Sequence, residues 1–132
     1  MNEYYEFYWA CIRTPNDCDP AQVALPGSDA FNALTRTRND LISNGQFVGD
    51  EPQGYLVIES VEAMSDHVLV RTCWWSTAVL YGPPAPDGTP VVQNDTNGSS
   101  REEYQFVEDE AGSWMIRRGD TTDSIAEENL CE

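Results

Sequence analysis

The sequence predicts an α+β domain in which N-terminal helices pack on a curved antiparallel sheet. Two observations predict this fold class. Apolar residues recur at spacings of three and four up to residue 44, whereas later apolar residues alternate or form β-branched runs. The later runs are joined by short links, which favours antiparallel strands that follow the helices. A chain of 132 residues suits one domain with one core, so we expect a single domain over residues 1–132.

The first helix is expected over residues 1–14. Its aromatic side chains fall at helical spacing and form one stripe, which consists of Tyr4, Tyr5, Tyr8 and Trp9. The helix should end before Pro15, because proline cannot continue the backbone hydrogen bonding of a helix. Residues 15–27 are then expected to form a loop.

The second helix is expected over residues 28–44. Ser28 can cap its start, and the pair Asn44-Gly45 favours a left-handed cap at its end. Its apolar face would consist of Ala30, Phe31, Leu34, Leu41 and Ile42.

The curved sheet is expected over residues 53–118. Runs rich in β-branched and aromatic residues predict four antiparallel strands, at 55–61, 68–81, 103–107 and 113–118. The proline-rich connection at 82–100 carries Asp87-Gly88 and Asn97-Gly98, and we expect it to protrude as a hairpin of its own. Residues 119–132 are expected to form an acidic tail.

The charge balance excludes two classes of partner. The chain has 23 acidic residues against seven basic ones, all of them Arg, and a net charge of −16 at pH 7. Such a charge repels nucleic-acid phosphates and anionic lipid surfaces. No apolar run is long enough to insert directly into a membrane. We interpret the acidity first as a feature of a soluble surface; the alternative is an acidic site for a cationic partner.

Four cysteines point to disulfide bonds rather than to a metal. No C-x-x-C pair occurs, and His67 is the only histidine, so the spacing fits no zinc site and we expect neither a metal nor a cofactor. Two pairings would stabilise the fold by closing loops. Cys11 with Cys18 would close a turn, and Cys73 with Cys131 would attach the C-terminus to a strand. Four cysteines allow three connectivities, and the sequence does not choose among them.

Disulfides indicate an oxidising compartment. The first residues of the chain have neither a basic segment nor an apolar one, so they do not form a signal peptide. We expect an extracytoplasmic protein, secreted or lipid-anchored, whose leader precedes Met1 in the precursor. The alternative is a cytoplasmic protein with reduced cysteines.

The order of short motifs resembles the nuclear transport factor 2-like superfamily over nearly the whole chain. These motifs are the aromatic segment from Tyr5 to Trp9, a second helix ending in Asn-Gly, a Val- and Arg-bearing strand that leads into Cys73, and the final strand with Gly112, Trp114 and Ile116. More narrowly, the chain is similar to uncharacterised secreted or lipid-anchored actinobacterial members with a cysteine in the same strand and one at the C-terminus. The resemblance implies a cone-shaped, cystatin-like domain with an apolar pocket and a homodimer formed through the sheet.

Enzymes that resemble this fold use an acid or base on a strand that faces the pocket, with a polar partner. Strand alternation places Arg118 and Asp120 on the same face as Trp114 and Ile116, so they are one candidate pair, with a surface ion pair as the alternative. Glu59 in an apolar strand and Tyr104 complete the catalytic candidates, although Glu59 equally suits a solvated face. His67 follows a turn, where a histidine is usually solvated. None of these forms a catalytic signature.

The aromatic residues favour binding over catalysis. Only one of Trp74 and Trp75 can face the helices, because neighbouring strand residues point to opposite faces. The candidate ligand-binding set is Tyr5, Trp9, Phe31, Trp74, Tyr104 and Trp114, and its alternative role is ordinary core packing. We therefore expect a non-catalytic extracytoplasmic domain that binds an apolar small molecule or a protein partner through this pocket or through the sheet face. The alternative is a small polyketide-cyclase-like or isomerase-like enzyme that uses a pocket carboxylate as general base.

Overall fold

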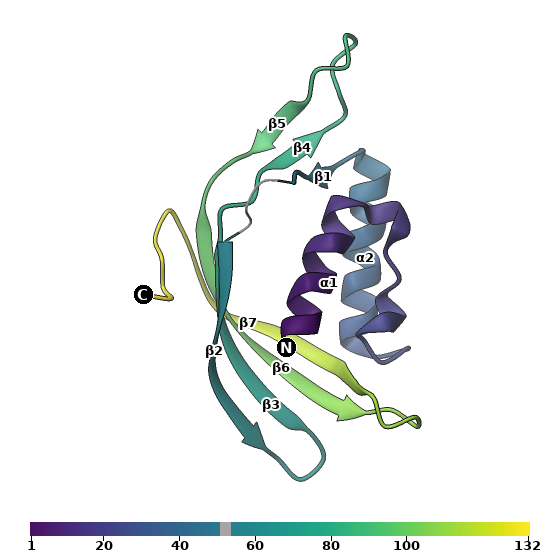
Figure 1. Ribbon diagram of the computed structural model, residues 1–132, viewed down its shortest axis with the longest axis vertical. Coiled ribbons are helices and arrows are strands. Elements are labelled where there is room, and N and C mark those ends of the chain that lie inside the picture. Colours follow the sequence, from purple (N-terminus) through teal and green to yellow (C-terminus); the bar gives the residue numbers. More distant parts are fainter. Residues whose placement is uncertain (51–53) are drawn as a thin grey trace.

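The computed structural model describes residues 1–50 and 54–132 and has an α+β architecture. Two helices lie together on one side of a bent antiparallel sheet (Figure 1). The helices are α1 (Asn2–Arg13) and α2 (Asp29–Asn44). The main sheet has the order β2-β3-β6-β7, formed by Gly54–Ala63, Val68–Ser76, Gly98–Glu108 and Trp114–Ala126. A small sheet with the order β1-β4-β5 extends beyond it and is formed by Phe47–Val48, Leu80–Gly82 and Val91–Asn94.

Both helices have the predicted bounds to within one residue. The Ser28 hydroxyl accepts a hydrogen bond from the Phe31 amide at 3.2 Å, which is the expected N-terminal cap of α2. Gly45 ends α2 with φ at +63°, in the left-handed region that glycine adopts without strain. The predicted start and end signals of α2 are therefore confirmed.

The segment between the helices is more ordered than the predicted loop. It contains two short 3₁₀ turns, Pro15–Asp17 and Pro20–Gln22, and the Cys11–Cys18 disulfide closes the first of them onto α1. The buried residue Ala24 then forms a parallel bridge with Ile116 of β7. This bridge ties the inter-helix segment to the sheet.

The predicted strand over 68–81 is two strands in different sheets. β3 ends at Ser76, whose hydroxyl accepts a hydrogen bond from the Ala78 amide, and the chain then enters β4 of the small sheet. β4 pairs with β5, so the 82–100 connection forms the protruding hairpin that the sequence predicts. Figure 1 shows this hairpin extending away from the helices.

The boundary predicted at residue 118 is wrong, and most of the predicted acidic tail is strand. β7 continues to Ala126, which pairs with Gly98 at the start of β6. Polar residues fill this half of both strands, so no apolar alternation marks it in the sequence. Backbone pairing between neighbouring strands does not require apolar side chains on both faces.

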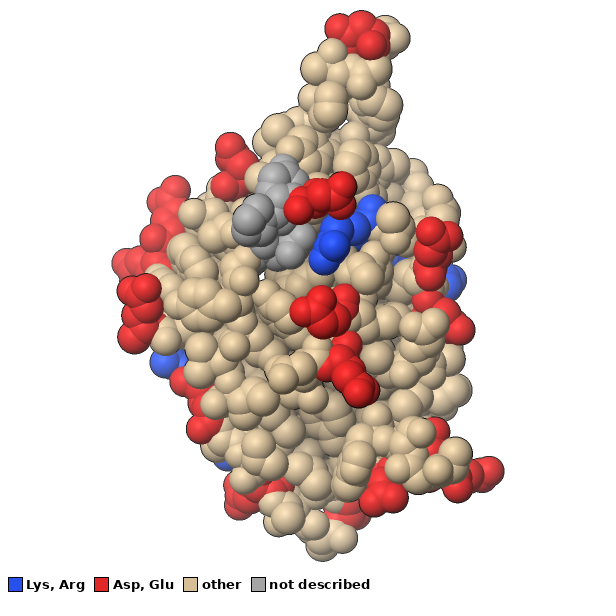
Figure 2. Space-filling view, viewed as in Figure 1, with Lys and Arg blue, Asp and Glu red and all other residues tan. Residues whose placement is uncertain are grey.

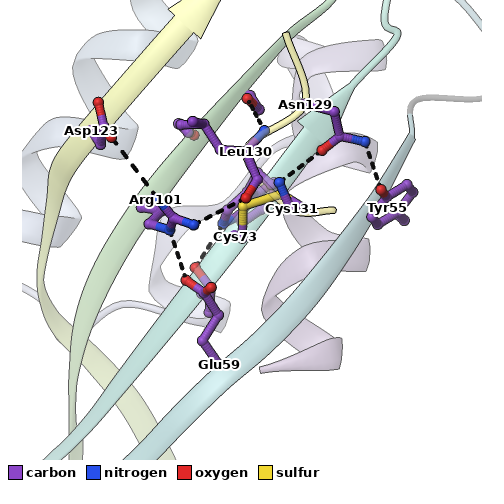
Figure 3. The surroundings of a disulfide bond; sticks show 12 residues. Tyr55, Glu59, Cys73, Arg101, Asp123, Asn129, Leu130 and Cys131 are labelled. Atoms are coloured by element: carbon purple, nitrogen blue, oxygen red, sulfur yellow. Dashed lines mark hydrogen bonds and ion pairs between the residues drawn. A yellow bond between two sulfur atoms is a disulfide. The ribbon is translucent and has the colours of Figure 1, made fainter.

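The last six residues fold back over the face of the sheet that lies away from the helices (Figure 3). A disulfide joins Cys131 to Cys73 of β3, and Cys73 is fully buried beneath this segment. The Ser99 hydroxyl donates to the Glu128 carbonyl at 2.6 Å and accepts from the Leu130 amide at 2.9 Å. Both cysteine pairings considered from the sequence are therefore present.

The core lies between the helices and the concave face of the main sheet. Its buried members come from both helices and from the sheet and include Trp9, Ile12, Leu34, Trp74, Tyr104 and Ile116. In the part of the chain that the structure describes, no helix is both long and apolar enough to cross a membrane.

Candidate ligand cavity

A cavity of about 440 Å³ lies between α1 and the concave face of the sheet. One wall is aromatic, with Tyr4, Tyr8 and Trp9 from α1 and Trp74 from β3. The other wall carries small polar side chains from the polar halves of β6 and β7, including Ser100 and Ser124. The rim is formed by Asn94 at the end of β5 and by Thr96 and Asn97 between β5 and β6.

Trp74 is the centre of the aromatic wall. Its ring lies 5.2 Å from the ring of Tyr5, 5.6 Å from Tyr8 and 6.3 Å from Trp9, measured between centroids. These pairs are tilted or edge-to-face, which are favourable arrangements for aromatic quadrupoles. The Trp74 indole N–H donates to the Thr72 hydroxyl at 3.1 Å, so the ring has a fixed orientation.

Glu102 of β6 places a carboxylate in this otherwise uncharged lining. The Tyr104 hydroxyl donates to Glu102 Oε2 at 2.5 Å. Two further hydroxyls, those of Ser100 and Thr121, donate to Oε1 at 3.2 and 3.3 Å. Among the described residues that line the cavity, Glu102 is the single charged side chain.

The tyrosines around Glu102 stay protonated. Desolvation by burial raises the pKa of Tyr104 far above its ordinary value, and the nearby phenol of Tyr4 and carboxylate of Glu102 raise it further. Burial likewise raises the pKa of Tyr4 and Tyr8, with a smaller contribution from Glu102 in each case. These phenols therefore act as neutral hydrogen-bond donors and aromatic walls near neutral pH.

A smaller cavity of about 270 Å³ adjoins the first one on the side of α2. Tyr4, Tyr8, Glu102 and Tyr104 line both cavities and so form the partition between them. Gly119 of β7 makes room for this partition, because a β-carbon there would lie 3.0 Å from the Tyr104 ring. A larger residue at 119 would force the Tyr104 ring to shift.

The structure brings only part of the predicted aromatic set to the cavity. Trp9, Trp74 and Tyr104 line it. Tyr5 does not line it, but its ring packs against the ring of Trp74, and the Tyr5 hydroxyl donates to the Gly54 carbonyl at 3.1 Å. Phe31 packs against the core from α2 and lines neither cavity.

Trp114 does not belong to the cavity. It is 54% exposed and lies at the far end of β7, beside a separate depression that also contains His67. The last strand begins at this residue, so its side chain lies beyond the area that the helices cover.

The predicted pair Arg118 and Asp120 does not face the pocket. A bulge in β7 between the pairs Phe106–Ile116 and Gln105–Arg118 shifts the alternation of the strand. Gly119 and Thr121 consequently face the helices, whereas Arg118 and Asp120 form an exposed ion pair at 2.8 Å. Strand parity from the sequence cannot predict a bulge.

Glu59 also lies outside the cavity. It is the extra residue of a bulge in β2, and its carboxylate accepts a hydrogen bond from Arg101 Nε at 3.3 Å on the face that the C-terminal segment covers (Figure 3). The catalytic candidates from the sequence thus reduce to Tyr104.

His67 is less solvated than expected, with 15% of its side chain exposed. Its Nδ1 lies 2.6 Å from Asp66 Oδ1, and Arg117 reaches the other oxygen of the same carboxylate at 3.4 Å. The hydrogen bond to His67, assisted by Arg117, lowers the pKa of Asp66. This network joins the β2–β3 turn to β7 and lies outside the cavity.

The predicted set lacks the polar lining of the cavity and also three residues at its centre: Tyr4, Tyr8 and Glu102. A signal for Glu102 was present, because it lies two residues before Tyr104 and therefore on the same strand face. Tyr4 and Tyr8 belong to the predicted helical stripe, and their spacing of four places them one above the other on α1.

Comparisons with known proteins give one informative likeness. No protein-family model matches the chain, and no curated protein matches it. The fold is similar to the crystal structure of the intermembrane space region of chloroplast protein ARC6, with a TM-score of 0.69. The two chains share 14% sequence identity, and the match covers 91% of this chain and 88% of the other. At this identity the likeness concerns the fold alone.

Proposed function

We propose that this protein is a non-catalytic, extracytoplasmic binding domain that holds a small molecule in the cavity between α1 and the sheet. The observation that carries the proposal is the aromatic wall of Tyr4, Tyr8, Trp9 and Trp74, opposite a polar strand surface in a cavity of about 440 Å³. Small-molecule sites have volumes in this range and combine apolar walls with a few polar groups.

The superfamily and the compartment are part of the same proposal. Two helices followed by a bent antiparallel sheet with a cavity between them support a cone-shaped nuclear transport factor 2-like domain, related to the actinobacterial members named above. The disulfides Cys11–Cys18 and Cys73–Cys131 support an oxidising compartment, because such bonds rarely persist in the cytosol.

We also propose a homodimer through the sheet. The supporting observation is β2, an edge strand on which Val57, Ile58 and Val61 are exposed. An exposed apolar edge strand is a common site for pairing with another chain. Sedimentation should give a dimer that Val61→Asp converts to a monomer; a monomeric wild-type protein at high protein concentration would contradict this part.

The cavity is tested with N-phenyl-1-naphthylamine, an uncharged apolar dye whose fluorescence rises in an apolar site. We expect saturable binding to the wild-type protein. Ser124→Trp fills the cavity from β7 and should abolish binding, whereas Asp123→Trp, one residue away and exposed, should leave it unchanged. Absence of saturable binding, or equal loss in both variants, would contradict the proposed function.

One observation favours the enzymatic alternative. Glu102 and Tyr104 place a carboxylate and a protonated phenol 2.5 Å apart inside an aromatic cavity, the groups that an isomerase-like or cyclase-like reaction uses as base and as hydrogen-bond donor. Proton exchange at the α-carbon of 1-indanone in deuterium oxide tests this alternative. Exchange that is faster than the buffer rate and is lost in Glu102→Gln would support an enzyme.

A further inference from the structure

Among the residues that the structure describes, the Glu102 carboxylate has neutral hydrogen-bond donors but no cationic partner. Its donors are the hydroxyls of Ser100, Tyr104 and Thr121. The arginines of the sheet form their ion pairs elsewhere: Arg71 and Arg101 with acids on the opposite face, Arg117 with Asp66 and Arg118 with Asp120. Within the described residues no arginine lines either cavity that Glu102 borders.

The aromatic rings beside Glu102 suit a cation as well. Tyr4, Tyr8, Trp9 and Trp74 line the same cavity as the carboxylate. Aromatic rings attract ammonium groups through the negative charge on their faces, and cages of tyrosine and tryptophan bind quaternary ammonium compounds in this way. An anion would meet the opposite conditions, because both the carboxylate and the ring faces repel it.

The charge of the whole molecule acts in the same direction. The net charge is −16, and acidic side chains are spread over the face shown in Figure 2 while basic ones are few. A field of this sign raises the local concentration of small cations near the protein and accelerates their association.

A metal ion fits these groups poorly. Among the described residues no group of three or more histidine, cysteine, aspartate or glutamate side chains could hold a metal ion. Calcium and magnesium require several oxygen ligands, and aromatic carbons supply none.

We propose that the cavity binds an organic cation whose ammonium group is neutralised by Glu102 and surrounded by the rings of α1 and Trp74. This inference rests on the proposed binding function and names the chemical class of the ligand. The cavity of about 440 Å³ has room for a substituted ammonium group with an apolar tail, and Asn94, Thr96 and Asn97 at its rim offer hydrogen bonds to a polar end.

The test compares two probes of nearly equal shape, benzyltrimethylammonium and its uncharged carbon isostere neopentylbenzene. Each displaces bound N-phenyl-1-naphthylamine in competition titrations, and the quenching of tryptophan fluorescence is followed in parallel. The wild-type protein should bind the cation at least tenfold more tightly than the isostere.

Three variants assign the preference to Glu102. Glu102→Gln should bind the two probes with similar affinity, and Glu102→Asp, which keeps the charge, should retain part of the preference. Glu103→Gln is the matched control, because it removes the same charge at the next position of β6 on the opposite face, where Glu103 pairs with Arg71. It should keep the full preference for the cation. Far-ultraviolet circular dichroism confirms that each variant is folded.

The outcomes separate the two proposals. If the dye binds but the cation and the isostere compete equally, the cation inference is wrong and the binding function stands. If Glu103→Gln lowers the preference as much as Glu102→Gln does, the preference comes from net charge and the inference is again wrong. If neither the dye nor any probe binds, the proposed function fails as well.

Discussion

The two faces of the main sheet are built from the same strands but stabilised in different ways. The concave face carries buried rings, hydroxyls and Glu102, a carboxylate to which residues 1–50 and 54–132 supply no counter-ion. The opposite face carries ion pairs, such as Arg71 with Glu103, and the C-terminal segment held by the Cys73–Cys131 disulfide. Half-exposed ion pairs contribute little to stability, so aromatic burial on one face and a covalent bond on the other are the main contributions.

This difference has a functional consequence. On the face away from the helices, acids and arginines satisfy one another. On the concave face the polar halves of β6 and β7 leave space that no apolar side chain fills, and the charge of Glu102 is directed into it. The cavity that we propose as a binding site therefore lies where the polar halves of β6 and β7 extend beyond the apolar core.

The largest expected effect comes from the centre of the aromatic wall. Trp74→Ala should lower the free energy of unfolding by about 4 kcal/mol, because it leaves a large void among four rings of α1. Trp75→Ala, on the other face of β3 and only partly buried, should cost about 1–2 kcal/mol. Urea denaturation measures both values. Equal losses would show that tryptophan burial contributes equally to the free energy of unfolding on the two faces.

The disulfides test the covalent contribution. Replacing Cys73 and Cys131 by alanine should cost about 4 kcal/mol, against about 2.5 kcal/mol for the same change at Cys11 and Cys18, because the first bond closes the longer loop. Denaturation of the two double variants measures the difference. The first variant should also lose hydrogen-exchange protection at the Leu130 amide, and a reversed order of stabilities would contradict the prediction.

The buried phenols predict an alkaline loss of stability. Because burial raises the pKa of Tyr104 in the folded state, its contribution is complete below the unfolded value of about 10 and is lost as the pH rises above that value. Tyr104→Phe should therefore make stability fall less steeply above pH 10, by about 1.4 kcal/mol per pH unit. Denaturation midpoints at pH 7, 10 and 11 measure the slope, and identical slopes in the two proteins would refute this assignment.

The smallest effect is expected at the predicted catalytic pair. Arg118→Ala should change the free energy of unfolding by no more than about 0.5 kcal/mol, because Arg118 and Asp120 are both half exposed. It should also leave dye binding unchanged. A loss of binding would place Arg118 near the ligand and contradict the parity shift that the β7 bulge produces.

Local signals in the sequence were sufficient for the helices and for the existence of the strands. Ser28, Gly45 and Pro15 act on their own neighbours, so the bounds of α1 and α2 follow from the sequence to within one residue. The protruding hairpin also follows from its turn residues. The observed pair of disulfides is one of the three connectivities that four cysteines allow, and only the fold determines which sulfur atoms meet.

The site depended on contacts between segments that are distant in sequence. A bulge in β7 turned Asp120 away from the cavity, and the pairing of β2 with β3 placed Glu59 on the outer face beside Arg101. Neither strand reveals its register or its bulges alone. The position of Glu102 opposite the rings of α1 likewise depends on how the helix packs on the sheet. The sequence by itself determined the α+β class, the helix ends and the acidic charge, because these depend on near neighbours or on composition. Only the tertiary structure decided which polar groups face the cavity, because pairing and packing set the face to which each side chain points.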